Sequence, residues 1–475
     1  MEKYAAVDLG AESGRIVVGD VRAIEEVYRF ENQPVRIGNS IYWDVLGIYT
    51  EIKRGLKTAF NRYPDQIRSI GLDSWGVDYA LLDRQGDLIG GVYHYRDPRN
   101  DGVPQQVYTR VPRREVYEET GIQHMQINTI YQLYAHGKAK PELIEQACTM
   151  LTVPNLFHYW LTGQMRSEFS HVTTTQLYNP RTRDWSWRII DALGFNRKWF
   201  GEIVAPGTKL GALLPHVAEE LDAPSGVMVI ASASHDTASA VAAIPAPGKT
   251  NYAYISSGTW SLLGCESPEP IITDKSYAYN FTNEGAADGG IRFLKNIIGL
   301  WIVQECKRHW DRTDRKYSYG ELTDLARQFG PAAFSIDCND PRFLKPGLID
   351  DSMPDRILAY CREHGQKEPQ NPGEVVRGVL QSLAELYAAF IRELEDASDQ
   401  SLEQLYIIGG GSQNTLLCEL TARAAGIPVF AGPVEATAIG NIMVQAISMG
   451  ELESIQQGRE LILESYAIEE FAPGS

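Results

Sequence analysis

Two short segments, one in each half of the chain, share a pattern of strand, small-residue turn and returning strand. In the first half, segment 4–19 carries the turn Gly10-Ala11-Glu12-Ser13-Gly14, and in the second half segment 252–264 carries Ser257-Gly258-Thr259. Glycine and small hydroxyl residues let backbone amides approach an anion closely. The repeated pattern predicts two similar α/β lobes whose hairpins contact a triphosphate from opposite sides. A plain hairpin turn is the alternative interpretation at either position.

Chain length supports two domains, because 475 residues exceed what one hydrophobic core usually holds. We expect the domains to be 1–245 and 250–475, with Gly248-Lys249 as the linker. The segment 243–250 ends in Gly-Lys-Thr and approaches a P-loop pattern. A P-loop needs a strand before it and a helix after it, whereas here the expected order is reversed. We therefore reject a P-loop at this position.

Composition excludes some classes of partner. The net charge is −17 and is spread along the chain, so a nucleic-acid partner or an anionic membrane surface is not expected. An anionic ligand such as a nucleotide must then be held locally, by backbone amides and a metal ion. The six cysteines are widely spaced without a C-x-x-C pair, and no apolar run suits a signal peptide or membrane helix. We expect a cytoplasmic protein with free thiols.

The stretch 229–241 is where we place the chemistry. An apolar run typical of a buried strand is followed by Ser234-His235-Asp236-Thr237 and then by small residues of good helical propensity. A carboxylate at such a strand-to-helix turn is well placed to accept a proton from a substrate hydroxyl. The alternative is that Ser234 or Asp236 only caps the helix.

Three further stretches carry candidate ligand contacts. Asp8, at the end of the first strand, could hold a metal ion through water. The polar break at Asp73-Ser74-Trp75-Gly76-Val77-Asp78 combines carboxylates, an aromatic face and a glycine, a set that suits sugar binding. A surface loop is the alternative interpretation of the same residues. The three glycines at 409–411 follow an apolar strand and leave room for a flat ring such as adenine.

The remaining pattern is mainly helical. Residues 375–394 predict an amphipathic helix. Residues 294–306 also predict a helix, which would carry Asn296 and Gln304 near one edge. The segment 313–372, rich in charge and proline, is interpreted as an insertion.

Taken in order, these stretches resemble the FGGY family of carbohydrate kinases, and specifically members that act on L-rhamnulose. The resemblance covers about residues 4–450. It is carried by Asp8–Arg15, Asp73–Asp78, Ser234–Val241, Ser256–Leu262, Thr282–Gly285 and Ile408–Thr415.

The resemblance implies two actin-like (ribonuclease H-like) lobes, the N-terminal one for sugar and phosphate and the C-terminal one for nucleotide. It implies transfer of the γ-phosphoryl group of ATP to O1 of L-rhamnulose in rhamnose breakdown, with Mg²⁺ as cofactor. By motif position, Asp236 would be the base. The substrate contacts would be Gly76, His235, Asp236, Thr237 and Asn296. The ATP contacts would be Ala11, Glu12, Ser13, Gly14, Arg15, Thr259, Gln304 and Gly410.

Two other functions are kept open. A kinase of the same family could act on another ketose or polyol, such as L-fuculose or L-ribulose, because one hydroxyl contributes only about 1–3 kcal/mol of discrimination in an apolar pocket. An actin-like ATP-binding protein without sugar turnover is the rival from a different class. The expected assembly is a monomer or a small homo-oligomer.

Overall fold

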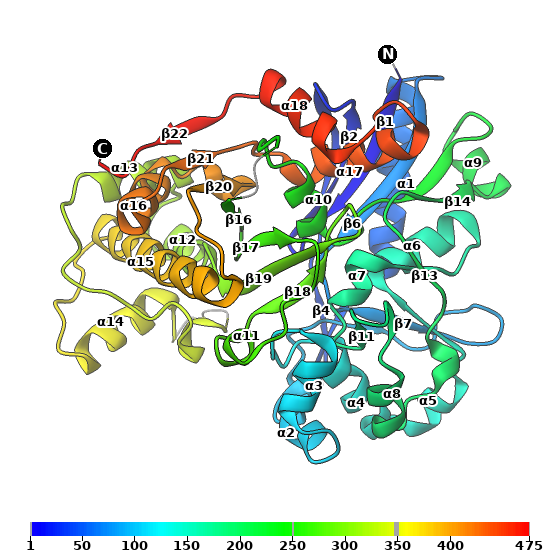
Figure 1. Cartoon of the computed structure of the whole chain (residues 1–475), viewed down its shortest axis with the longest axis horizontal. Coiled ribbons are helices and arrows are strands. Elements are labelled where there is room, and N and C mark those ends of the chain that lie inside the picture. The colour runs from blue at the N-terminus through cyan, green and yellow to red at the C-terminus, as the bar shows by residue number, and fades with distance from the viewer. Residues whose placement is uncertain (1, 249–250, 346–350, 475) are drawn as a thin grey trace. The chain divides into compact units, whose positions relative to one another are not determined.

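A computed structural model describes residues 2–248, 251–345 and 351–474 of the chain (Figure 1). It consists of two compact units that alternate along the sequence. The first unit comprises Met1–Gly248, Glu266–Phe293 and Ala436–Ser465. The second comprises Lys249–Cys265, Leu294–Glu435 and Tyr466–Ser475. The expected division at 245–250 stays a prediction, and Lys249 and Thr250, at the expected linker, lie outside the described residues.

The first unit is built on a six-stranded mixed sheet. Its strand order is β14 (Thr208–Ala212), β15 (Met228–Ala231), β6 (Ile67–Ser74), β1 (Lys3–Leu9), β2 (Ser13–Gly19) and β3 (Ile24–Glu31). The β1–β2 hairpin is antiparallel, as the glycine turn predicts, while β1 pairs in parallel with β6 and β6 with β15. This register sets Asp8 beside Arg15 on one side and Asp73 on the other.

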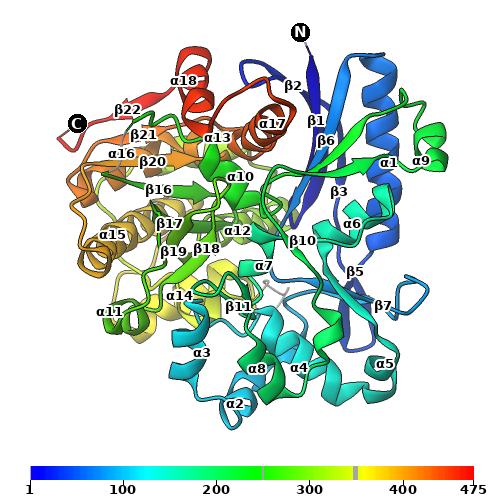
Figure 2. The ribbon, with the colours of Figure 1, turned by 45° about the vertical axis from the view of Figure 1, so that its right-hand side comes forward.

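Helices cover both faces of this sheet. Helix α1 (Val45–Arg62) and helix α17 (Ala436–Met449) lie on opposite sides (Figure 2). The apolar face of α1 reaches the core through side chains such as Ile52 and Leu56, both fully buried. Helix α17 instead contacts the sheet through polar side chains. The side-chain amides of Asn441 and Gln445 hydrogen bond to each other and to β1 and β6.

Glycines allow α17 to approach so closely. A Cβ on Gly71 of β6 would lie 2.2 Å from Asn441 Oδ1. A Cβ on Gly440 of α17 would lie 1.8 Å from the backbone oxygen of Ser239 in α10 (Asp236–Ala242). Helices α10 and α17 therefore pack backbone to backbone, which fixes where the first residue of α10 lies.

The rest of the first unit surrounds the sheet with short elements. Its strands are β4 (Val35–Ile37), β5 (Ser40–Trp43), β7 (Tyr79–Leu82), β8 (Val92–Tyr93), β9 (Thr149–Thr152), β10 (Ser167–Glu168), β11 (Tyr178–Asn179), β12 (Asp184–Trp185), β13 (Ile203–Val204) and β18 (Thr282–Gly285). Its helices are η1 (Pro98–Asn100), α2 (Val103–Tyr108), α3 (Arg113–Thr120), α4 (Thr129–Ala139), α5 (Pro141–Gln146), α6 (Val153–Thr162), α7 (Phe169–Thr173), α8 (Trp187–Leu193), η2 (Arg197–Trp199), α9 (Pro215–Glu220), α11 (Asp274–Ala278) and α18 (Ile455–Ser465).

The second unit repeats the strand arrangement of the first. Its sheet runs β19 (Ile291–Ile298, in this unit from Leu294), β17 (Trp260–Ser267, in this unit to Cys265), β16 (Tyr252–Ser257), β20 (Gln404–Ile408), β21 (Val429–Ala431) and β22 (Glu469–Phe471). An antiparallel hairpin, β16–β17, is again followed by parallel strands, β20 and β21. A central hairpin extended by parallel strands is the ribonuclease H-like arrangement, so the repeated glycine hairpins correspond to a repeated sheet.

The helices of the second unit are α12 (Trp301–Thr313), α13 (Tyr319–Arg327), η3 (Pro341–Phe343), α14 (Met353–Glu363), α15 (Pro372–Ser398), η4 (Gly410–Gln413) and α16 (Thr415–Ala425). The helix predicted for 375–394 is confirmed within α15. The helix predicted for 294–306 is wrong in its first half, because Leu294–Ile298 ends strand β19 and the helix starts at Trp301. Gly299 separates the two, where a Cβ would lie 2.5 Å from Ser261 Oγ. No helix of the described residues is both long and apolar enough to cross a membrane.

Candidate active site

Three carboxylates gather at the ends of β1 and β6 and at the start of α10. Asp8 Oδ2 accepts hydrogen bonds from Arg15 Nε at 2.9 Å and Arg15 Nη2 at 2.7 Å. Asp73 is completely buried, and its Oδ2 accepts from Asn441 Nδ2 at 2.5 Å, whereas its Oδ1 has no hydrogen-bond partner among the described residues. Burial, and then the negative charge of Asp8, raise the pKa of Asp73 well above its ordinary value, with a smaller contribution from Asp236.

Asp236 is the first residue of α10, and His235 occupies the N-cap position without a side-chain capping bond. Ser234 therefore does not cap the helix, whereas the Asp236 carboxylate, one position inside it, accepts from a first-turn amide, so a capping role stays the alternative for Asp236. Asp236 Oδ1 accepts from the Thr237 amide at 2.5 Å and from Thr237 Oγ1 at 3.1 Å. The side chain is still 32% exposed. Partial burial raises the pKa of Asp236, which His235 opposes and Asp8 reinforces. The result is a carboxylate anchored by one oxygen and accessible to a ligand.

His235 is held from behind by a buried arginine that sequence reasoning missed. Arg292, on β19, is fully buried, and its Nη2 donates to His235 Nδ1 at 3.0 Å. The same nitrogen lies 3.3 Å from Glu284 Oε2, and Arg292 Nε donates to the Gly285 carbonyl at 2.8 Å. Because a guanidinium can only donate, we assign Nδ1 of His235 as the acceptor and place the proton of a neutral His235 on Nε2; Glu284 Oε2 also lies 3.3 Å from Nδ1. That nitrogen lies 3.5 Å from Asp236 Oδ1.

Gly76 lies against the same imidazole, and its contact with a sugar stays a prediction. A Cβ at this position would be 3.3 Å from His235 Nε2 and 3.3 Å from Thr174 Oγ1. The next residue, Val77, has φ of +69°, and its amide donates to Thr174 Oγ1 at 3.1 Å. The small residue therefore leaves open the space in front of His235 Nε2.

Asp78, in the same polar break, has a structural role. Its Oδ2 accepts from Trp43 Nε1 at 2.5 Å and Trp75 Nε1 at 3.0 Å, and its Oδ1 accepts from Gln132 Nε2 at 2.8 Å. Burial raises its pKa to about 6. Since both oxygens are occupied, Asp78 holds the two indoles in place, and we do not assign it to a sugar hydroxyl.

The loop before α10 is fixed by a second buried acid that the sequence did not reveal. Glu168 Oε2 accepts from the Ser234 amide at 3.1 Å, from Ser170 Oγ at 2.7 Å and from the His171 amide at 3.2 Å. Its Oε1 accepts from the Ser170 amide at 2.9 Å, and Ser170 Oγ in turn accepts from the His235 amide at 3.1 Å. Burial raises the pKa of Glu168 to about 7, although all four hydrogen bonds favour the ionised form.

The candidates of the second unit gather at the start of α12 and at the glycine turn. The amides of Gly299 and Trp301 donate to the Thr259 carbonyl at 3.1 and 3.2 Å, so the β16–β17 turn rests on the beginning of α12. Gln304 lies one turn further along α12, and its Oε1 is buried without a hydrogen-bond partner among the described residues.

Asn296 and Gly410 lie on separate elements of the second unit, β19 and η4. Asn296 lies on β19 rather than on the expected helix. Gly410 begins the 3-10 turn η4, and a Cβ there would meet no atom within 4 Å, so open space lies over the backbone.

Most predicted residues of the first unit thus fall into one group. Asp8, Arg15, Gly76, His235, Asp236 and Thr237 surround the ends of β1 and β6 and the start of α10. In the glycine hairpin, the Gly10 amide donates to the Ser13 carbonyl, and a Cβ on Gly14 would lie 2.2 Å from the Phe30 ring. Ala11, Glu12 and Ser13 remain half-buried or exposed at its tip. No cluster of three or more His, Cys, Asp or Glu residues in the described chain has the geometry of a metal cage.

The repeated sheet and the anchored carboxylate define an actin-like protein with a candidate transfer site. The chain matches the FGGY family of carbohydrate kinases, with the N-terminal domain over residues 3–243 and the C-terminal domain over residues 253–449. It belongs to this family and is a carbohydrate kinase, which excludes an actin-like protein without sugar turnover.

Two curated relatives cover almost the whole chain. A rhamnulokinase of Halalkalibacterium halodurans is 44% identical over 474 residues, covering 99% of both chains. A rhamnulokinase of Bacteroides thetaiotaomicron is 41% identical, covering 99% of this chain and 96% of its own.

Solved structures share the fold at much lower identity. A gluconate kinase of Lactobacillus acidophilus has a TM-score of 0.80 at 14% identity, covering 99% of this chain and 94% of its own. A glycerol kinase of Plasmodium falciparum with ADP has a TM-score of 0.76 at 14% identity, covering 98% and 94%. These matches establish the two-domain actin-like fold.

Proposed function

We propose that this kinase transfers the γ-phosphoryl group of ATP to O1 of L-rhamnulose. The observation that carries the reaction is the geometry of Asp236, which has one oxygen anchored by Thr237 and a side chain that remains accessible. The choice of sugar rests on the near full-length similarity to rhamnulokinases. Kinases for L-fuculose or L-ribulose in the same family remain the alternative.

In the proposed step, Asp236 orients the O1 hydroxyl and accepts its proton. The O1–H bond breaks, the O1–P bond forms, and the bond between the γ-phosphorus and the bridging oxygen breaks to release ADP. Asp236 has a raised pKa, which makes it a better base than an ordinary aspartate. His235 presents Nε2–H beside the same carboxylate, so it can donate to a sugar oxygen while Arg292 fixes its tautomer. Thr237, Gly76 and Asn296 complete the proposed sugar contacts.

We assign the nucleotide to the two glycine turns. The hairpin from Ala11 to Arg15 (Ala11, Glu12, Ser13, Gly14 and Arg15) and the turn at Thr259 are proposed phosphate contacts. Gln304 is a proposed nucleotide contact because its buried Oε1 lacks a hydrogen-bond partner in the described chain. Gly410 is proposed to lie against the base, because the space over its backbone is open.

Members of this family use ATP with a divalent cation, and we propose Mg²⁺. The residues fit this ion: Asp73 Oδ1 is a buried oxygen without a hydrogen-bond partner in the described chain, and it lies one strand from Asp8. Mg²⁺ commonly binds through one or two carboxylates while it keeps several waters, which agrees with contact to Asp8 through water. When bound, it would neutralise phosphate charge, while Arg15 keeps Asp8 oriented.

We also propose the cytoplasm as the compartment, since all six cysteines are free thiols. The oligomeric state stays a prediction of a monomer or small homo-oligomer.

The test is a coupled ADP-release assay with Mg-ATP and L-rhamnulose, L-fuculose, L-ribulose, D-xylulose or glycerol. Wild type is compared with Asp236→Asn and with Asp324→Asn, an exposed aspartate on α13 that serves as the matched control. We expect preference for L-rhamnulose and a loss on the order of 10²–10⁴ in kcat for Asp236→Asn alone. Preference for another sugar would move the substrate, and an active Asp236→Asn would refute the base.

A further inference from the structure

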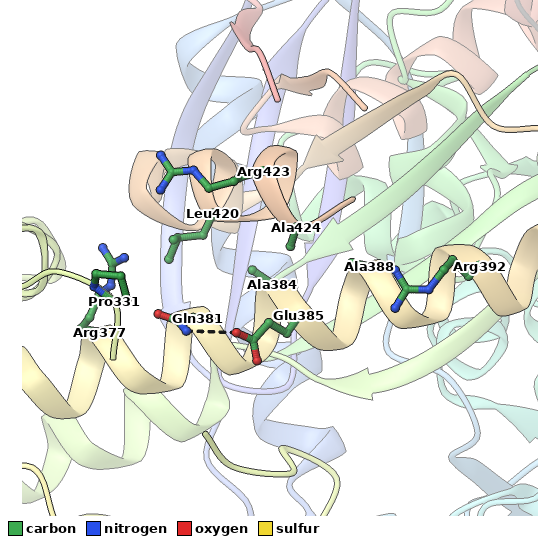
Figure 3. A pocket seen from close by; sticks show the side chains of 10 residues that line it. All are labelled: Pro331, Arg377, Gln381, Ala384, Glu385, Ala388, Arg392, Leu420, Arg423 and Ala424. Carbon is green, nitrogen blue, oxygen red and sulfur yellow. Dashed lines mark hydrogen bonds between the residues drawn. The ribbon is translucent and has the colours of Figure 1, made fainter. Parts of the chain in front are cut away.

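A pocket on the second unit, outside the residues assigned above, combines an apolar floor with arginines (Figure 3). It has a volume of about 370 Å³, within the usual size range of small-molecule sites. Helix α15 supplies one wall and α16 the other. The lining residues are Pro331, Arg377, Gln381, Ala384, Glu385, Ala388, Arg392, Leu420, Arg423 and Ala424.

Arg377 is the unusual member of this lining. Only 8% of the residue is exposed, its Nε is buried without a hydrogen-bond partner, and no ion pair to it is found among the described residues. Burial, and then the positive charges of Arg423 and Arg327, lower its pKa. The nearby Glu419 offers little compensation, because both of its oxygens already accept from Arg327 Nη1, at 2.7 and 2.6 Å. Buried charges in proteins are normally paired, and the pocket's own carboxylate, Glu385, accepts a hydrogen bond from Gln381 rather than from Arg377, so this guanidinium has no direct counterion in the part of the chain that the structure describes.

The rest of the lining indicates that the anion pairing with Arg377 belongs to a ligand with an apolar part. Ala384, Ala388 and Leu420 are buried but form the floor, so a carbon skeleton can rest on them. Arg392 lies 15 residues after Arg377 on α15, or about 22 Å along the helix axis, so one anionic group cannot contact both. Figure 3 shows Arg377 and Arg392 toward opposite ends of the pocket.

We propose that this pocket binds an organic phosphate, with the phosphoryl group between Arg377 and Arg423 and the carbon skeleton on the alanine and leucine floor. Guanidinium groups bind phosphate oxygens in pairs, and a phosphate dianion offsets more of the positive charge here than a single carboxylate does. A second anionic group on the ligand would contact Arg392. This site takes part in neither the proton transfer nor the nucleotide contacts proposed above.

The probes are hexyl phosphate, hexane-1,6-diyl bisphosphate, hexanoate and inorganic phosphate. Binding is measured by titration calorimetry with saturating Mg-ADP present, so that the proposed nucleotide site is occupied. We expect one equivalent of hexyl phosphate to bind, and the bisphosphate to bind more tightly. Arg377→Met should weaken both at least ten-fold, whereas Arg392→Met should weaken only the bisphosphate. Ala424→Leu, which fills the half-buried floor without removing charge, should weaken both.

Arg36→Met, which removes an exposed arginine of the first unit, is the matched control and should leave binding unchanged. Thermal unfolding gives a second readout, because removing a buried cation without a counterion should raise the Tm of Arg377→Met above wild type without ligand. Ligand should then raise the Tm of wild type but not of this variant. Unchanged binding in Arg377→Met or Ala424→Leu, a lowered Tm for Arg377→Met, or equal affinity for hexanoate would each overturn the proposal.

Discussion

Replacing Glu168 by Gln should change how stability depends on pH. Glu168 is completely buried, and its pKa is raised from 4.5 to about 7. Between these two values the native state holds a proton that the unfolded state has released, so the free energy of unfolding falls as pH rises. At 1.36 kcal/mol per pH unit over about 2.5 units, this group alone lowers stability by about 3 kcal/mol from pH 4.5 to pH 7.

Glu168→Gln cannot ionise, so it should lack this contribution. It has its own cost, because its amide nitrogen cannot accept a hydrogen bond. If the amide oxygen takes the place of Oε2 it keeps three donors, and the Ser170 amide, which now faces an NH₂ group, is left unsatisfied at about 1–3 kcal/mol. The variant should therefore be less stable than wild type at pH 5 and should equal or exceed it at pH 7.5.

The assay is urea unfolding followed by tryptophan fluorescence at half-unit steps from pH 5 to 7.5. The difference in unfolding free energy between the two proteins cancels the contribution of every other titrating group that the substitution leaves unchanged. Curves that run parallel over this range would refute the reasoning, because Glu168 would then have the same charge in the folded and unfolded states. Kinase activity of the variant should fall about ten-fold or more, since Glu168 also holds the loop that presents His235.

Two further substitutions test the packing around Asp236. Gly440→Ala puts a methyl group into the backbone of α10, so it should lower the free energy of unfolding in urea by about 1–3 kcal/mol and also lower kcat. The control is Gly137→Ala, at a helical position with no neighbouring atom within 4 Å, which should be neutral or stabilising. Arg292→Met leaves Glu284 buried without its cation, so it should cost on the order of 3–5 kcal/mol. It should also lower kcat/KM more than Arg292→Lys does; equal values for the two variants would contradict the assigned tautomer.

The sequence predicts the parts of this protein whose signals are local. Both hairpins, the long helix α15 and the strand-to-helix turn at Asp236 follow from residues adjacent in the chain. The wrong prediction of one helix over 294–306 also comes from relying on local signals. A continuous apolar run is compatible with either helix or strand, and only Gly299 marks the boundary between them.

The residues that position the site depend on contacts distant in sequence. Arg292 reaches His235 across 57 positions, and Glu168 reaches the Ser234 amide across 66. Neither belongs to a recognisable motif. The available signal was a single charged residue within the apolar run 291–294, which is unusual enough in a buried strand to indicate a paired partner.

Because the chain is synthesised from its N-terminus, the segment Ala436–Ser465 determines when the first unit can complete its folding. It belongs to the first unit, although the whole of Leu294–Glu435 is synthesised before it. Until α17 emerges from the ribosome, Asp73 lacks its partner Asn441, and α10 has no helix against which to pack. While residues 232–435 are being made, the first unit of a nascent chain has all six strands of its sheet but lacks α17 on one face, and Asp236 becomes fixed only when nearly all of the chain has been translated. A translational arrest before residue 436 should leave a protein whose proposed base is present but not positioned.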